Sequence, residues 1–247
     1  QRQYPVTRMG QFAELREVFA EVQKSDGKSE RAKAFARVLA NEQPLIVSAV
    51  HADDMVKVVL WAESLGIHLV LVDAIESYKI ADFLAEHKVP VILQCSYAPH
   101  RGYGLDEGRP TGESIPDLRA ASILTKAGVR VALHASTDQD LKDLLFIAGT
   151  AVRWGLSPED ALRAITLNPA KFLGVSHRIG SIERGKQADL VFLNADPFQA
   201  IALPQQVMVD GEFVYQRTNA DNQTYDIALA DASRSKNRDI IAIRAGK

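Results

Sequence analysis

The sequence predicts an α/β fold with a parallel sheet, followed by a small antiparallel β unit. Between residues 45 and 134, four short apolar runs alternate with helical patterns. These runs are continuous rather than interleaved with polar residues, which is typical of a parallel sheet covered on both faces. After residue 179 the apolar period changes to that of a strand, which indicates hairpins.

Taken in order, the chain begins with two predicted helices within residues 12–40. A predicted helix follows each of the four strands, and the first carries Met55, Val58, Val59, Ala62 and Leu65 on one face. The third helix is delayed by a long loop, residues 95–116, rich in Gly, Pro, Arg and Tyr, and therefore a candidate lid. The predicted strands are LIVSAV at 45–50, HLVLVD at 68–73, VPVILQ at 89–94 and VRVALH at 129–134.

The C-terminal part begins with helices and ends with strands. Ser157 is a predicted N-cap, because Pro158 and two carboxylates follow it. A short helix from Asn168 is expected to stop at Gly174. Strands are predicted at 188–193 and 207–215, the latter turning at Asp210-Gly211.

The composition excludes several classes of partner. Lys and Arg number 29 against 31 for Asp and Glu, a net charge of −2, so no basic field exists for a nucleic acid or an anionic membrane surface. The apolar runs fall short of the roughly 18 residues that span a bilayer, so we expect no membrane span. The single cysteine, Cys95, excludes an internal disulfide and a Cys-based zinc cluster.

Hydrophobic residues make up 47% and charged residues 24%, as in an ordinary soluble globular protein, whether cytoplasmic or periplasmic. The first residue is Gln1, and no apolar signal-peptide stretch follows it. We therefore expect this chain to be a piece of a longer polypeptide or a processed product.

Several motifs resemble one family. The stretch GSIERGKQADLV at 180–191, followed by Asp196-Pro197 and the turn near Asp210, resembles the C-terminal β segment of the amidohydrolase superfamily. The preceding ALRAITLNPAKFLG at 161–174 is similar to the final barrel-helix region of those proteins. The opening YPVTRMG at 4–10 and the ADDM turn at 52–55 resemble the imidazolonepropionase and prolidase-like subset. The resemblance extends over residues 4–216.

Members of this superfamily are (β/α)8 barrels with an added β-sandwich, and they hydrolyse C–N bonds with one or two metal ions. The resemblance implies that this chain is the C-terminal half of a TIM-type barrel, strands five to eight, with a small β-sandwich segment. The expected division is a half-barrel at 1–178, the β-sandwich segment at 179–216 and a peripheral extension at 217–247.

Half a barrel leaves two sheet edges whose backbone groups need partners. We therefore expect the chain to pack against the N-terminal half of the barrel, or against another protein chain. The absent strands would include the first, whose His-x-His pair is part of the metal site that the resemblance implies.

The resemblance also locates the metal ligands at the carboxyl ends of the strands. Ser48 stands at the position of the strand-five histidine, Asp73 at that of the strand-six histidine, and Ser136 at that of the strand-eight aspartate. A neutral serine is a poor zinc ligand, and one carboxylate cannot build a three-ligand site. We therefore predict no metal and no other cofactor.

An alternative keeps a zinc site, with His51 and Asp138 displaced from the usual positions and acting with His134. Asp138 is more simply explained as a helix-start residue, whereas His134, which is expected to face the barrel mouth, can equally be a hydrogen-bonded structural histidine. His100 and Arg101 in the long loop are candidates for binding an anionic or aromatic ligand, the alternative being a solvated loop.

Two functions follow. The first is a catalytically degraded amidohydrolase-like subunit, a pseudoenzyme, that acts in assembly or partner binding. The second is an active metal-dependent hydrolase of non-peptide or dipeptide C–N bonds, completed by the missing half.

Overall fold

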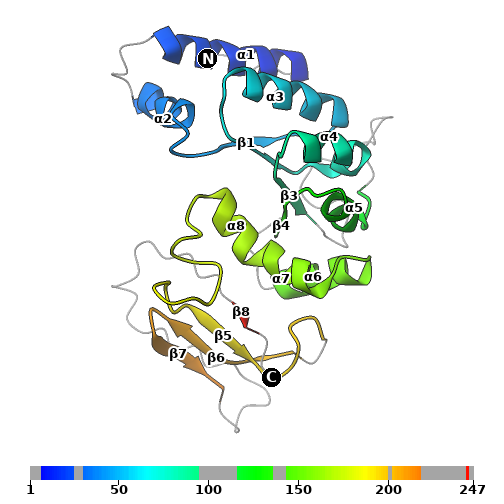
Figure 1. Ribbon diagram of the computed structural model, residues 1–247, viewed down its shortest axis with the longest axis vertical. Coiled ribbons are helices and arrows are strands. Elements are labelled where there is room, and N and C mark those ends of the chain that lie inside the picture. Colours follow the sequence, from blue (N-terminus) through cyan, green and yellow to red (C-terminus); the bar gives the residue numbers. More distant parts are fainter. Residues whose placement is uncertain are drawn as a thin grey trace.

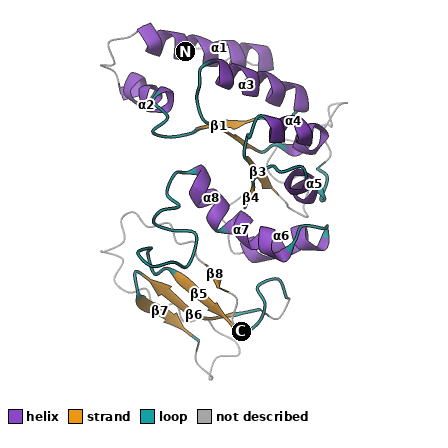
Figure 2. Ribbon diagram, in the orientation of Figure 1, coloured by secondary structure: helices purple, strands orange, loops and turns teal. Residues whose placement is uncertain are grey.

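The computed structural model describes residues 7–24, 30–94, 116–135, 143–199, 202–217 and 243–244. It contains two four-stranded sheets, with helices around the first (Figure 1; Figure 2). In the described part of the chain, no helix is long and apolar enough to cross a membrane. The candidate lid, apart from Pro116, lies outside the described residues.

The first sheet is fully parallel, as the continuous apolar runs predicted. Its strands pair in the order β1-β2-β3-β4, so their carboxyl ends meet at one edge of the sheet. Each strand lies within a predicted run: β1 is Leu45–Ser48, β2 Leu69–Val72, β3 Val91–Gln94 and β4 Val131–His134.

Helices cover one face of this sheet. Helix α3 (Ala52–Ser64) buries Met55, Val58, Val59 and Ala62, the face that the apolar spacing predicted. Helices α1 (Arg8–Lys24) and α2 (Glu30–Leu39) lie near α3 (Figure 1), and the rings of Phe12 and Phe19 meet Trp61 edge to face. The remaining helices of this part are α4 (Ala81–Glu86), α5 (Ala120–Lys126), α6 (Leu144–Arg153) and α7 (Pro158–Ile165).

Two helix boundaries differ from the sequence prediction. The segment after β2 begins as a 3-10 helix, η1 (Ile75–Ile80), before α4. The helix predicted from Asp117 begins at Ala120, because the Asp117 carboxylate accepts a hydrogen bond of 2.8 Å from the backbone N–H of Arg119 and holds a turn. The predicted N-cap of α7 is confirmed, with Ser157 Oγ 3.0 Å from the N–H of Asp160.

A short helix, α8 (Leu167–Phe172), covers part of the opposite face of the sheet. Phe172 packs there with Val70 and Ala132 in a small cluster separate from the main core. The amide of Asn168 donates a 2.7 Å hydrogen bond to the carbonyl oxygen of Val131, at the amino end of β4. Helix α8 therefore lies over the amino-terminal part of this face.

The second sheet has the order β7-β6-β5-β8. Strands β5 (Leu190–Leu193), β6 (Pro204–Val209) and β7 (Glu212–Gln216) are antiparallel, and β8 (Ile243–Arg244) adds in parallel to β5. The predicted turn is confirmed, since Asp210 and Gly211 both have positive φ, at 50° and 84°. Buried Asp189 accepts a 2.7 Å hydrogen bond from the N–H of Asp210 and fixes this turn.

Candidate functional site

Three polar side chains meet at the carboxyl edge of the parallel sheet, and we call them the mouth cluster: Ser48, Asp73 and His134. Ser48 ends β1, Asp73 follows β2 and His134 ends β4. Ser48 Oγ donates a 2.8 Å hydrogen bond to Asp73 Oδ2, and His134 Nε2 lies 3.4 Å from Asp73 Oδ1. The Asp73 carboxylate therefore joins a strand at one edge of the sheet to the strand at the other.

The backbone of Asp73 is held in an unusual conformation. Its φ is 56°, in the left-handed region that aspartate tolerates better than most residues. The N–H of Ile75 donates a 2.8 Å hydrogen bond to the carbonyl oxygen of Asp73, closing a tight turn after β2. Such conformations are more frequent at functional sites than elsewhere.

The electrostatics of the cluster favour a charged His134. The neighbouring Asp73 carboxylate raises the pKa of His134, burial opposes this, and the bond to the backbone oxygen of Ala135 adds to the rise. The Nδ1 atom lies 2.9 Å from that oxygen. Nε2 is buried and has no well-formed hydrogen bond, so its contact with Asp73 is an ion pair at 3.4 Å. When His134 is protonated, its charge and that of the Asp73 carboxylate compensate each other.

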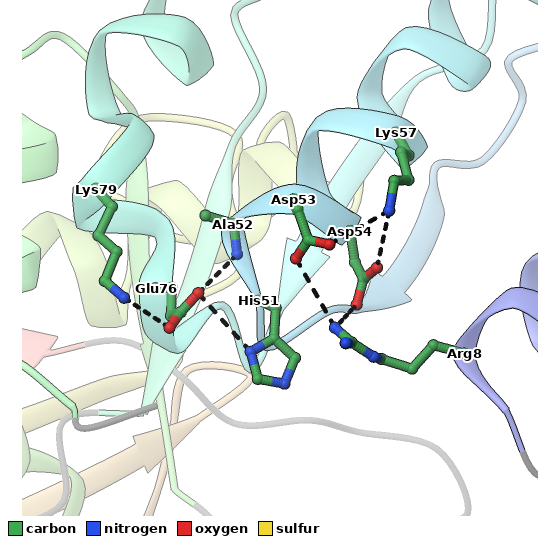
Figure 3. A network of polar contacts seen from close by, with 8 residues as sticks. All are labelled: Arg8, His51, Ala52, Asp53, Asp54, Lys57, Glu76 and Lys79. Carbon is green, nitrogen blue, oxygen red and sulfur yellow. Dashed lines mark hydrogen bonds and ion pairs between the residues drawn. The ribbon is translucent and has the colours of Figure 1, made fainter. Parts of the chain in front are cut away.

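A second polar network, centred on Glu76, lies at the same edge (Figure 3). Glu76 Oε2 accepts a 3.0 Å hydrogen bond from the N–H of Ala52, the first residue of α3, and Oε1 binds Lys79 Nζ at 2.7 Å. His51 Nδ1 is 3.8 Å from Glu76 Oε2. The structure therefore places His51 beside Glu76, where a carboxylate caps α3 and ties it to η1.

Arg8 extends the polar contacts to α1. Its Nη1 atom lies 2.7 Å from Asp54 Oδ2 and 3.8 Å from Asp53 Oδ1, and Lys57 approaches the same two carboxylates (Figure 3). These contacts join α1 to the first turn of α3. Because these charged groups are largely exposed, their ion pairs contribute little to the stability of the fold.

Beside the mouth cluster is a small pocket with about 20 Å³ of space, room for about one water molecule. Gln94, at the end of β3, and Asp117 line it together with Asp73. Sequence reasoning missed both residues as well as Glu76. For Gln94, its place at the end of a predicted strand was an available signal.

The described residues do not fit a three-ligand zinc site. Among them, no group of three His, Cys, Asp or Glu side chains is placed to hold a metal ion. Ser48 directs its hydroxyl hydrogen to Asp73, and His134 is turned to the same carboxylate. The structure brings Ser48, Asp73 and His134 together at the carboxyl edge of the parallel sheet. Ser136, Asp138, His100 and Arg101 lie outside the described residues.

The chain belongs to the amidohydrolase family, whose model it matches over residues 18–214. Several of the curated proteins that it resembles are imidazolonepropionases. It is 34% identical to the imidazolonepropionase of Thermoplasma volcanium over 116 residues, which are 43% of this chain and 28% of the relative. It is 35% identical over 94 residues to adenine deaminase 2 of Jannaschia sp., covering 36% of this chain and 14% of that protein.

Solved structures agree with this assignment. An amidohydrolase from Thermotoga maritima superposes with a TM-score of 0.73 at 33% identity, over 87% of this chain and 58% of that chain. An adenosine deaminase from Xanthomonas campestris with bound zinc has a TM-score of 0.53 at 20% identity, over 85% of this chain and 57% of that chain. At this identity the likeness is one of fold alone. This chain spans less than two thirds of each of these proteins.

Proposed function

We propose that this chain is an amidohydrolase-like subunit that has lost metal-dependent catalysis and acts by binding a partner. The mouth cluster carries this proposal, because the Asp73 carboxylate is already engaged by Ser48 and His134. A catalytic zinc needs three protein ligands and one open position. Here the hydroxyl of Ser48 and the imidazole of His134 already contact the carboxylate that a cation would need.

The corresponding architecture is half of a barrel, in which β1 to β4 are barrel strands five to eight. The parallel order of the strands supports this, as does the 58% coverage of the Thermotoga maritima structure. We propose residues 1–178 as the half-barrel, 179–216 as the β-sandwich segment and 217–247 as an extension, of which β8 pairs with β5.

A second candidate is an active hydrolase whose zinc site is completed outside the described residues. Asp73 and His134 lie together at the strand ends, and the adenosine deaminase of similar fold carries zinc. The names of the relatives then suggest imidazolone-type or adenine-type rings as substrates, and the sequence resemblance to prolidase-like hydrolases adds dipeptides.

Metal analysis tests the proposal against a zinc site that residues of this chain complete. The full chain is incubated with equimolar zinc, dialysed and measured by mass spectrometry for bound metal, beside Asp73→Asn and the exposed control Asp82→Asn. We expect substoichiometric zinc that is equal in all three proteins, and no turnover of 4-imidazolone-5-propionate, adenine or a prolyl dipeptide. One zinc per chain that is lost in Asp73→Asn and kept in Asp82→Asn would overturn the proposal.

A further inference from the structure

We draw no further inference here: the strongest candidate, the groove between η1, the start of α4 and the end of α5, carries charges of both signs in Lys79, Asp82 and Lys126 beside its apolar walls, and nothing in the described part of the chain shows what occupies it.

Discussion

The ion pair between His134 and Asp73 gives the protein a predictable pH dependence. Because the pKa of His134 is raised above its ordinary value of 6.5, chiefly by Asp73, the charged imidazole stabilises the folded state. This contribution is complete below the unfolded-state pKa and is lost as pH rises through the folded-state pKa. We expect His134→Gln to be destabilising at low pH, and the difference from wild type to shrink as pH rises above about 6.5.

Urea unfolding over a pH series measures this, with the exposed histidine of His68→Gln as the control. A difference between His134→Gln and wild type that stays constant with pH would contradict the assignment of a charged His134.

Gly180 makes a second prediction at the scale of one residue. Its φ is +93°, and a Cβ there would lie 2.8 Å from Ala170 Cβ and 3.0 Å from the carbonyl oxygen of Thr166. Gly185 has a similar φ of +88° and nothing within 4 Å of the same position. We therefore expect Gly185→Ala to lower the free energy of unfolding by about 1 kcal/mol, because alanine is strained in the left-handed conformation. Gly180→Ala has the same strain and in addition a steric clash, which costs about 1–3 kcal/mol more.

Denaturant titration of the two variants measures the difference between their free energies of unfolding. Equal losses of stability would mean that α8 can move away from Gly180 without cost.

At the scale of elements, Glu76 holds two connections of the sheet together. Its carboxylate caps α3 through the N–H of Ala52 and binds Lys79 of η1. We expect Glu76→Ala to lower the free energy of unfolding by about 1–3 kcal/mol, because the half-buried N–H loses its acceptor. Glu76→Gln keeps an acceptor and costs less, and the exposed Glu86→Ala serves as the control.

Thermal unfolding ranks the four proteins. If Glu76→Ala and Glu86→Ala unfold at the same temperature, the cap of α3 contributes nothing measurable to stability.

The strands and the buried face of α3 could be predicted because their signals are local. Burial of Met55, Val58, Val59 and Ala62 follows from a period that a helix imposes over one segment. The Ser157 cap likewise depends on residues within one turn. Ser48, Asp73 and His134 were singled out from their places at strand ends, and the contacts among them follow from the pairing of parallel strands whose carboxyl ends meet at one edge.

The contacts that were missed join segments distant in sequence. Glu76 reaches Ala52 across 24 positions, and no local pattern around either residue marks this bond. Phe172 was assigned to a short helix, but its contact with Val70 and Ala132 depends on how that helix returns over the sheet. His51 turns to Glu76 because the loop after β1 lies against the turn after β2, a consequence of strand pairing.

At the scale of the whole molecule, the two sheets are connected through α8 and the loop that follows it (Figure 2). Helix α8 contacts β4 through Phe172 and Asn168, and Gly180 on the way to β5 packs against Ala170 and Thr166. The same short helix therefore covers the amino-terminal part of the sheet face opposite to the main core and anchors the chain leading to the second sheet.

Phe172→Ala tests this dual role. Phe172 is 6% exposed, so its removal uncovers Val70 and Ala132 and leaves a cavity, which costs about 3 kcal/mol or more. Phe213→Ala on β7 is the control, because Phe213 is 54% exposed and loses much less buried area. Since that face of the sheet opens in the first variant alone, we expect Phe172→Ala to bind more of an apolar fluorescent dye under folding conditions and to unfold at lower urea. Equal dye binding and equal midpoints in the two variants would show that α8 does not cover this face of the sheet, because Val70 and Ala132 cannot lose the aromatic ring that buries them without becoming exposed.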